Sequence, residues 1–168
     1  MLTSHELFGF MSPALANDIL GYIFESDKKT YKATLQAVAD ARKVRAVFLE
    51  RHSRIERHAL MMTTLARPGS EMIAAGLLRA WLMQKQTAML IDFLDALSLP
   101  HDKGVVENLP DSVPDDKLKA AVDLLLGKYP HETVALYLNA FNGMNEANWA
   151  NLKAMLESDS RLQLGTAA

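Results

Sequence analysis

The sequence predicts an all-α protein, a compact multi-helix bundle of six to eight helices forming a single domain over residues 1–168. Apolar residues recur at three- and four-residue spacing, and no run of four or more residues alternates as a strand does. A chain of this length buries enough surface to form a hydrophobic core without disulfide bonds. Faint similarity among three helical segments leaves a second arrangement open, in which helix pairs stack side by side.

Capping residues mark the helices of the N-terminal half. Residues 1–11 are expected to form an arm, and Ser12 before Pro13 then signals a helix start, with proline at the first helical position. Asp27 is expected to cap the next helix. The stretch 44–52 is open, because it suits either a continuation of that helix or a separate connector.

Two more helices are expected before the middle of the chain. Ser53 and Glu56 form a capping box, so a helix is predicted from Arg54 to Ala66. Ser70 is expected to cap the longest periodic segment, residues 71–99. That segment is either one helix or two helices with a kink near its middle.

The C-terminal half contains several turn signals, mostly Pro, Gly and Asn. They predict a loop over 100–114, a helix from Asp115 to Gly127, a helix from Pro130 to Asn142, a helix capped by Asn145, and a tail over 159–168.

Composition narrows the possible environment of the protein. There are no cysteines, which excludes disulfides, thiolate metal sites and cysteine nucleophiles, and favours the cytoplasm. The N-terminus lacks the charge and apolar run of a signal peptide. The longest uncharged run covers about 13 residues, 133–145, whereas a membrane-spanning helix needs about 20. We therefore expect no membrane association.

Charge is unevenly distributed along the chain. The net charge is −2, but residues 28–67 hold ten Lys/Arg against three acids, which is +7, and the remainder carries −9. Such a division indicates either an anion-binding patch or attraction between two parts of one domain.

The basic segment 42–57 holds the candidate binding residues Arg51, Arg54 and Arg57, to which we add His58. Guanidinium groups suit carboxylate or phosphate, so an acidic protein surface or a small anionic ligand is a candidate partner. Nucleic acid is less favoured, because Phe48 is the one aromatic among these charges and the pI is about 6.2.

Methionines supply a candidate apolar interface. Five of the nine methionines fall between residues 61 and 89, and methionine both fills cores and lines adaptable binding surfaces. Core packing and an interface, with a second copy of the chain or with a partner helix, remain alternatives. The candidate interface residues are Met61, Met62, Trp81 and Met83.

Known catalytic, metal-binding and cofactor-binding motifs are absent from the sequence. Neither of the helical metal-binding patterns H-E-x-x-H and E-x-x-H occurs, and the glycines form no phosphate-binding loop. The leading hypothesis is therefore a non-enzymatic interaction or scaffold module of the cytoplasm, with no cofactor. The alternative is an enzyme or a binder of a small anionic ligand, using a pocket near Arg54, Arg57 and His58.

Overall fold

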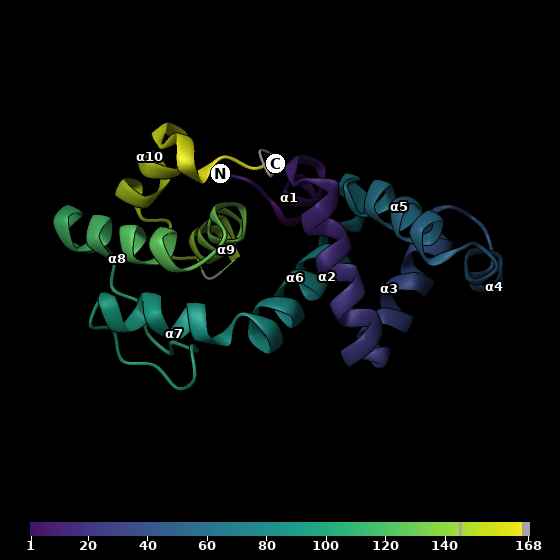
Figure 1. Cartoon of the computed structure of the whole chain (residues 1–168), viewed down its shortest axis with the longest axis horizontal. Coiled ribbons are helices and arrows are strands. Elements are labelled where there is room, and N and C mark those ends of the chain that lie inside the picture. The colour runs from purple at the N-terminus through teal and green to yellow at the C-terminus, as the bar shows by residue number, and fades with distance from the viewer. Residues whose placement is uncertain (145, 166–168) are drawn as a thin grey trace. The chain divides into compact units, whose positions relative to one another are not determined.

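Figure 1 shows the computed structural model of the chain, which describes residues 1–144 and 146–165. These residues form ten α-helices, more than the six to eight predicted, and no strand; Asp102 and Val105 make an isolated bridge. The all-α prediction is confirmed and the helix count is wrong. Within the described residues no helix is long and apolar enough to cross a membrane.

The chain divides into two compact units, which we describe separately. The N-terminal unit covers residues 3–81, and the C-terminal unit covers residues 82–165 together with Met1 and Leu2. Helix α6 (Glu71–Lys85) begins in the first unit and ends in the second.

In the N-terminal unit, helix α5 contacts α1, α2 and α3, and the short α4 packs on α3. The core includes Ile19, Leu20 and Met61, which are fully buried. Besides α6, the elements of this unit are α1 (Ser4–Phe10), α2 (Pro13–Ser26), α3 (Lys28–Ala41), α4 (Ala46–Glu50), α5 (Arg54–Leu65) and the 3-10 turn η1 (Pro68–Ser70).

Three predicted caps of the N-terminal unit are confirmed. The Ser12 hydroxyl accepts the Leu15 N–H, and the Asp27 carboxylate accepts the Thr30 N–H. Ser53 caps α5 through the predicted capping box. These starts are predictable because donor and acceptor lie three residues apart.

Other features of this unit differ from the prediction. Residues 4–10, inside the expected N-terminal arm, form α1, and the open stretch 44–52 contains the separate helix α4. Ser70, the expected cap of the segment 71–99, ends a 3-10 turn directly before α6, and its hydroxyl donates to the Thr64 carbonyl at 2.8 Å. Thr3 and Glu6 form a capping box at the start of α1, so this helix does have a local sequence signal.

The C-terminal unit is built around helix α9, which is buried along most of its length. Aromatic rings surround α9, with Phe141 5.2 Å from Phe93 and 5.1 Å from Trp149 between ring centroids. The elements of the unit are α7 (Thr87–Ala96), α8 (Asp115–Lys128), α9 (His131–Met144), α10 (Ala150–Ser158) and the 3-10 turn η2 (Ser160–Leu162).

The segment 71–99, for which one or two helices were expected, consists of two. Helices α6 and α7 are separated by Gln86, whose φ and ψ are −109° and 20°. Gly127 does not end α8, which continues to Lys128. Tyr129 precedes Pro130, and a residue before proline favours extended backbone. Helix α8 therefore ends at Lys128.

The end of the chain is more ordered than the predicted tail. Residues 160–162 form η2, and Leu162 is buried. Asn145, the predicted cap of the last helix, lies outside the described residues, as do residues 166–168. The helix itself begins at Ala150, with Trp149 at its N-cap position.

Candidate functional site

Arg54 lies at the N-terminal end of α5, where residues of α2 satisfy its charge. Its Nη1 donates to the Glu25 carboxylate at 2.9 Å, and its guanidinium carbon is 4.5 Å from the Phe24 ring centroid. The ion pair uses an N–H edge of the guanidinium, and the cation–π contact uses one of its faces. Arg54 is therefore engaged within the fold.

Arg57 is half-buried against the same aromatic surface. Its guanidinium carbon lies 5.6 Å from the ring centroid of Phe24 and 5.9 Å from that of Tyr31. Its Nε is buried and has no hydrogen-bond partner among the described residues. The aromatic rings hold this guanidinium mainly through stacking.

His58 is buried with 3% of its surface exposed, and its Nε2 lies 2.9 Å from the Tyr31 hydroxyl. Burial, followed by the charges of Arg54 and Arg57, lowers the pKa of His58 to about 4. The imidazole is therefore neutral near pH 7, and a hydrogen bond joins its Nε2 to the Tyr31 hydroxyl. Burial raises the pKa of Tyr31, against the opposing effect of Arg57. We call Arg54, Arg57, His58, Tyr31 and Phe24 the α5 N-terminal cluster.

Arg51, the remaining candidate of the basic segment, is exposed at the end of α4. It appears in none of the ring or hydrogen-bonded contacts of the α5 N-terminal cluster. The four predicted binding residues thus do not form one open basic patch.

The candidate apolar interface is also divided. Met61 and Trp81 are buried, with 0% and 3% of their surfaces exposed, whereas Met62 and Met83 are half-buried. The exposed large apolar side chains near the basic segment are instead Val47, Phe48 and Ile55, on α4 and at the start of α5.

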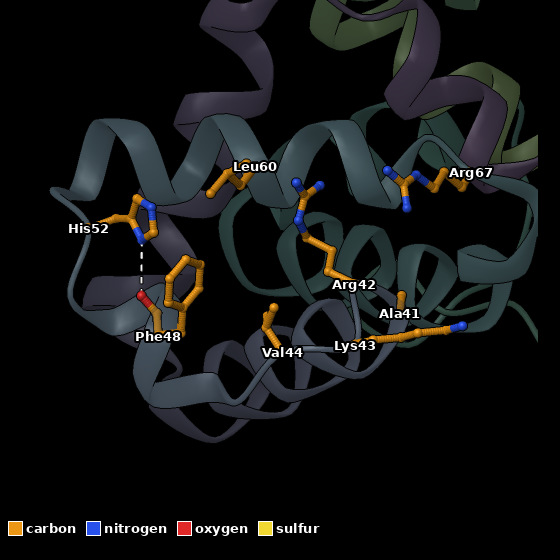
Figure 2. Close-up of a pocket in the computed structure, with 8 residues that line it drawn as sticks. All are labelled: Ala41, Arg42, Lys43, Val44, Phe48, His52, Leu60 and Arg67. Atoms are coloured by element: carbon orange, nitrogen blue, oxygen red, sulfur yellow. Dashed lines mark hydrogen bonds between the residues drawn. The ribbon is translucent and has the colours of Figure 1, made fainter.

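A pocket of about 460 Å³ lies between the end of α3, helix α4 and helix α5, and we call it the α3–α5 pocket. Arg42, Lys43 and Arg67 give it a cationic side. Figure 2 shows the Arg67 guanidinium extending towards that of Arg42, while Phe48 and His52 lie at the other end of the pocket.

The end of α3 shapes the pocket. The Val44 N–H bonds the Ala39 carbonyl at 3.0 Å and the Lys43 N–H bonds the Asp40 carbonyl at 3.1 Å. This is a Schellman motif, and Lys43 takes the left-handed conformation, φ +57°, that glycine usually provides. The reversal of the chain turns residues 42–44 towards α5, where the Arg42 Nη1 donates to the Thr64 hydroxyl at 3.3 Å.

No acidic side chain lines the α3–α5 pocket. Of the ten Lys/Arg in residues 28–67, Arg54 alone has a carboxylate partner within 4.0 Å in the part of the chain that the structure describes. Arg42, Lys43 and Arg67 therefore carry uncompensated positive charge there. Like charges held together in this way favour a bound anion.

The other end of the pocket is aromatic. The Phe48 side chain is 50% exposed, and its ring centroid is 5.1 Å from that of His52 in an edge-to-face contact. The His52 Nδ1 lies 3.0 Å from the Phe48 carbonyl. Since a carbonyl can only accept, Nδ1 carries the proton, and this bond holds the imidazole beside the exposed ring.

The sequence pattern pointed to neighbouring residues but not to this group. Arg42 lies inside the predicted basic segment, whereas Arg67 follows the predicted end of a helix 25 residues later. The available signal was that both arginines directly follow helix ends. Nothing in the spacing indicates that those two ends meet.

Metal binding finds no support in the described geometry. Within residues 1–144 and 146–165 no group of three or more His, Asp or Glu side chains could hold a metal ion. His101 instead contacts Asp95 at 2.7 Å and accepts the Gly104 N–H, which pins the loop after α7.

Comparison of the chain with known protein families, curated proteins and solved structures finds no match in any of the three. Function is therefore inferred from the geometry and charge of the α3–α5 pocket.

Proposed function

We propose that this chain is a non-enzymatic interaction module that binds an anionic group of a partner protein in the α3–α5 pocket. The supporting observation is that Arg42, Lys43 and Arg67 line one pocket without a carboxylate in the lining or within ion-pair distance in the described residues. Arginine in this setting suits recognition of carboxylate or phosphate. The lack of cysteines favours a cytoplasmic site of action.

Exposed apolar groups on α4 and at the start of α5 would add affinity. Val47 and Phe48 are 48% and 50% exposed on α4, and Ile55 is 81% exposed at the start of α5. A partner whose acidic residues neighbour apolar ones fits this surface, because charge steers the encounter while apolar contact slows dissociation. Arg51 is exposed and would contribute to steering alone.

Titration with a fluorescein-labelled hexaglutamate peptide, followed by anisotropy at physiological salt, tests this proposal. The double variant Lys43→Glu/Arg67→Glu changes two exposed pocket residues and should weaken binding by about tenfold or more. The matched control Arg45→Glu/Arg51→Glu makes the same change in net charge at two exposed positions outside the pocket lining. Equal losses in both variants would contradict a role for the pocket.

A small anionic ligand, bound with or without chemistry upon it, is the second candidate. The volume of about 460 Å³ lies within the range of small-molecule sites, which supports this reading. The originally expected position near Arg54, Arg57 and His58 is less favourable, because Arg54 already pairs with Glu25. A labelled oligothymidylate in the same titration tests the weaker nucleic-acid alternative through its steep dependence on salt.

A further inference from the structure

We infer that the anionic group bound by the α3–α5 pocket is a phosphate monoester attached to an aromatic body. The phosphate would lie between Arg42 and Arg67, and the aromatic body would lie against Phe48. This inference rests on the proposed function and adds the chemistry of the bound group. It follows from the charge of the pocket, from the number of its donors and from its aromatic end.

The charge balance of the pocket favours a dianion. Arg42, Lys43 and Arg67 bring three positive charges. Arg42 and Arg67 follow the C-terminal ends of α3 and α5, and each helix end supplies about −0.5 charge. About two positive charges remain, which matches the charge of about −1.5 to −2 on a phosphate monoester near pH 7. A carboxylate would leave about half of that charge uncompensated.

The number of available donors points the same way. One guanidinium fork takes one lone pair on each oxygen of a carboxylate, so a second arginine must share oxygens that already accept a hydrogen bond. A phosphate monoester has three terminal oxygens and accepts from two forks at once. Among the described residues Arg42 makes a single side-chain hydrogen bond, to the Thr64 hydroxyl, which uses one Nη and leaves its other donors for a ligand.

The aromatic end explains why the phosphate would carry a ring. Figure 2 places Phe48 and His52 at the end of the pocket away from Arg67, with Leu60 and Arg42 between. The Phe48 ring is half exposed and contacts His52 edge to face, so part of it is accessible to a second ring. Edge-to-face and offset stacked ring pairs are favourable beyond the area they bury.

Calorimetric titration of the full chain with phenyl phosphate, inorganic phosphate and benzoate tests this inference. Phenyl phosphate should bind about tenfold more tightly than benzoate, which has the same ring with a single negative charge. The variant Phe48→Ala should weaken the binding of phenyl phosphate by about threefold or more and leave the binding of inorganic phosphate unchanged.

Arginine variants locate the phosphate. Arg67→Gln, at an exposed position, and Arg42→Gln should each weaken the binding of phenyl phosphate by about tenfold. Arg54→Gln is the matched control, because this arginine already pairs with Glu25, and its effect should stay below about twofold. An equal loss in Arg54→Gln would overturn the assignment of the site, and Arg67→Gln remains informative even if Arg42→Gln fails to fold.

The outcomes separate this inference from the proposed function. Suppose that the hexaglutamate peptide binds through Lys43 and Arg67 and that benzoate binds as tightly as phenyl phosphate. The phosphate inference is then wrong and the proposed function stands. If neither the peptide nor any of the three anions binds, both are wrong. If phenyl phosphate binds as expected, a phosphotyrosine peptide and adenosine 5′-monophosphate distinguish the two sources of such a group, a modified protein side chain and a free nucleotide.

Discussion

The two ends of helix α5 carry arginines in opposite states. At the N-terminal end, Arg54 pairs with Glu25, and Arg57 lies against the rings of Phe24 and Tyr31. At the C-terminal end, Arg67 faces a pocket without an acidic lining residue. The difference comes from the neighbouring helices. At the N-terminal end of α5, helices α2 and α3 supply a carboxylate and two aromatic rings. At its C-terminal end, the end of α3 supplies Arg42 and Lys43, which are also positively charged.

The largest expected effect is a pH dependence confined to the α5 N-terminal cluster. The pKa of His58 is about 4 in the folded chain against 6.5 ordinarily, so between these values the unfolded state binds more protons. The free energy of unfolding should therefore fall by up to about 3 kcal/mol as the pH drops from about 6.5 to about 4. Urea unfolding at several pH values measures this loss.

Two histidine variants separate this contribution from other acid effects. His58→Gln should flatten the dependence between these pH values, because no imidazole then titrates in the cluster. His52→Gln, a change at a half-buried pocket residue, should keep the native slope. A native slope retained by His58→Gln would show that other groups cause the acid sensitivity.

Tyr31→Phe removes the hydroxyl that hydrogen-bonds His58 Nε2 and leaves a buried ring nitrogen without this partner. We expect a loss of about 1–2 kcal/mol in the free energy of unfolding, since an unsatisfied buried polar atom keeps its desolvation cost. Chemical denaturation at neutral pH measures it. An effect near zero would mean that water replaces the hydroxyl and that the cluster is less enclosed.

Arginine-to-alanine changes compare the two ends of α5 directly. Arg54→Ala loses a partly exposed ion pair and a cation–π contact, which should cost about 1 kcal/mol of stability. Arg67→Ala should leave stability unchanged or slightly raised, because it relieves repulsion in the pocket. Thermal unfolding at low salt compares the two variants, and a larger loss for Arg67→Ala would show that its charge is satisfied within the fold.

The smallest effect concerns the backbone beside the pocket. Lys43→Gly should raise the free energy of unfolding by about 0.5–1 kcal/mol, since relief of left-handed strain exceeds the extra chain entropy of glycine. Ser98, at φ +56°, occupies the same position after α7, where Leu99 N–H bonds the Leu94 carbonyl. Ser98→Gly is therefore the matched control for stability, whereas only Lys43→Gly should weaken anion binding.

The sequence by itself determined the helical class and several helix starts. Ser12, Asp27 and the pair Ser53 and Glu56 each act within three residues of the helix that they cap, so their effect is visible in the local pattern. The break at Gln86 carries no comparable signal, whereas Thr3 and Glu6 form a capping box at the start of α1 that the sequence already contains.

Tertiary structure decided which charges are free. Arg54 and Glu25 are 29 residues apart, and Arg42 and Thr64 are 22 apart, so local spacing could not show which arginine would meet a partner. The sequence placed the binding residues at Arg51, Arg54 and Arg57 because they are close in the chain. Coulomb energy depends on distance in space, and in space the uncompensated charges are those of Arg42, Lys43 and Arg67.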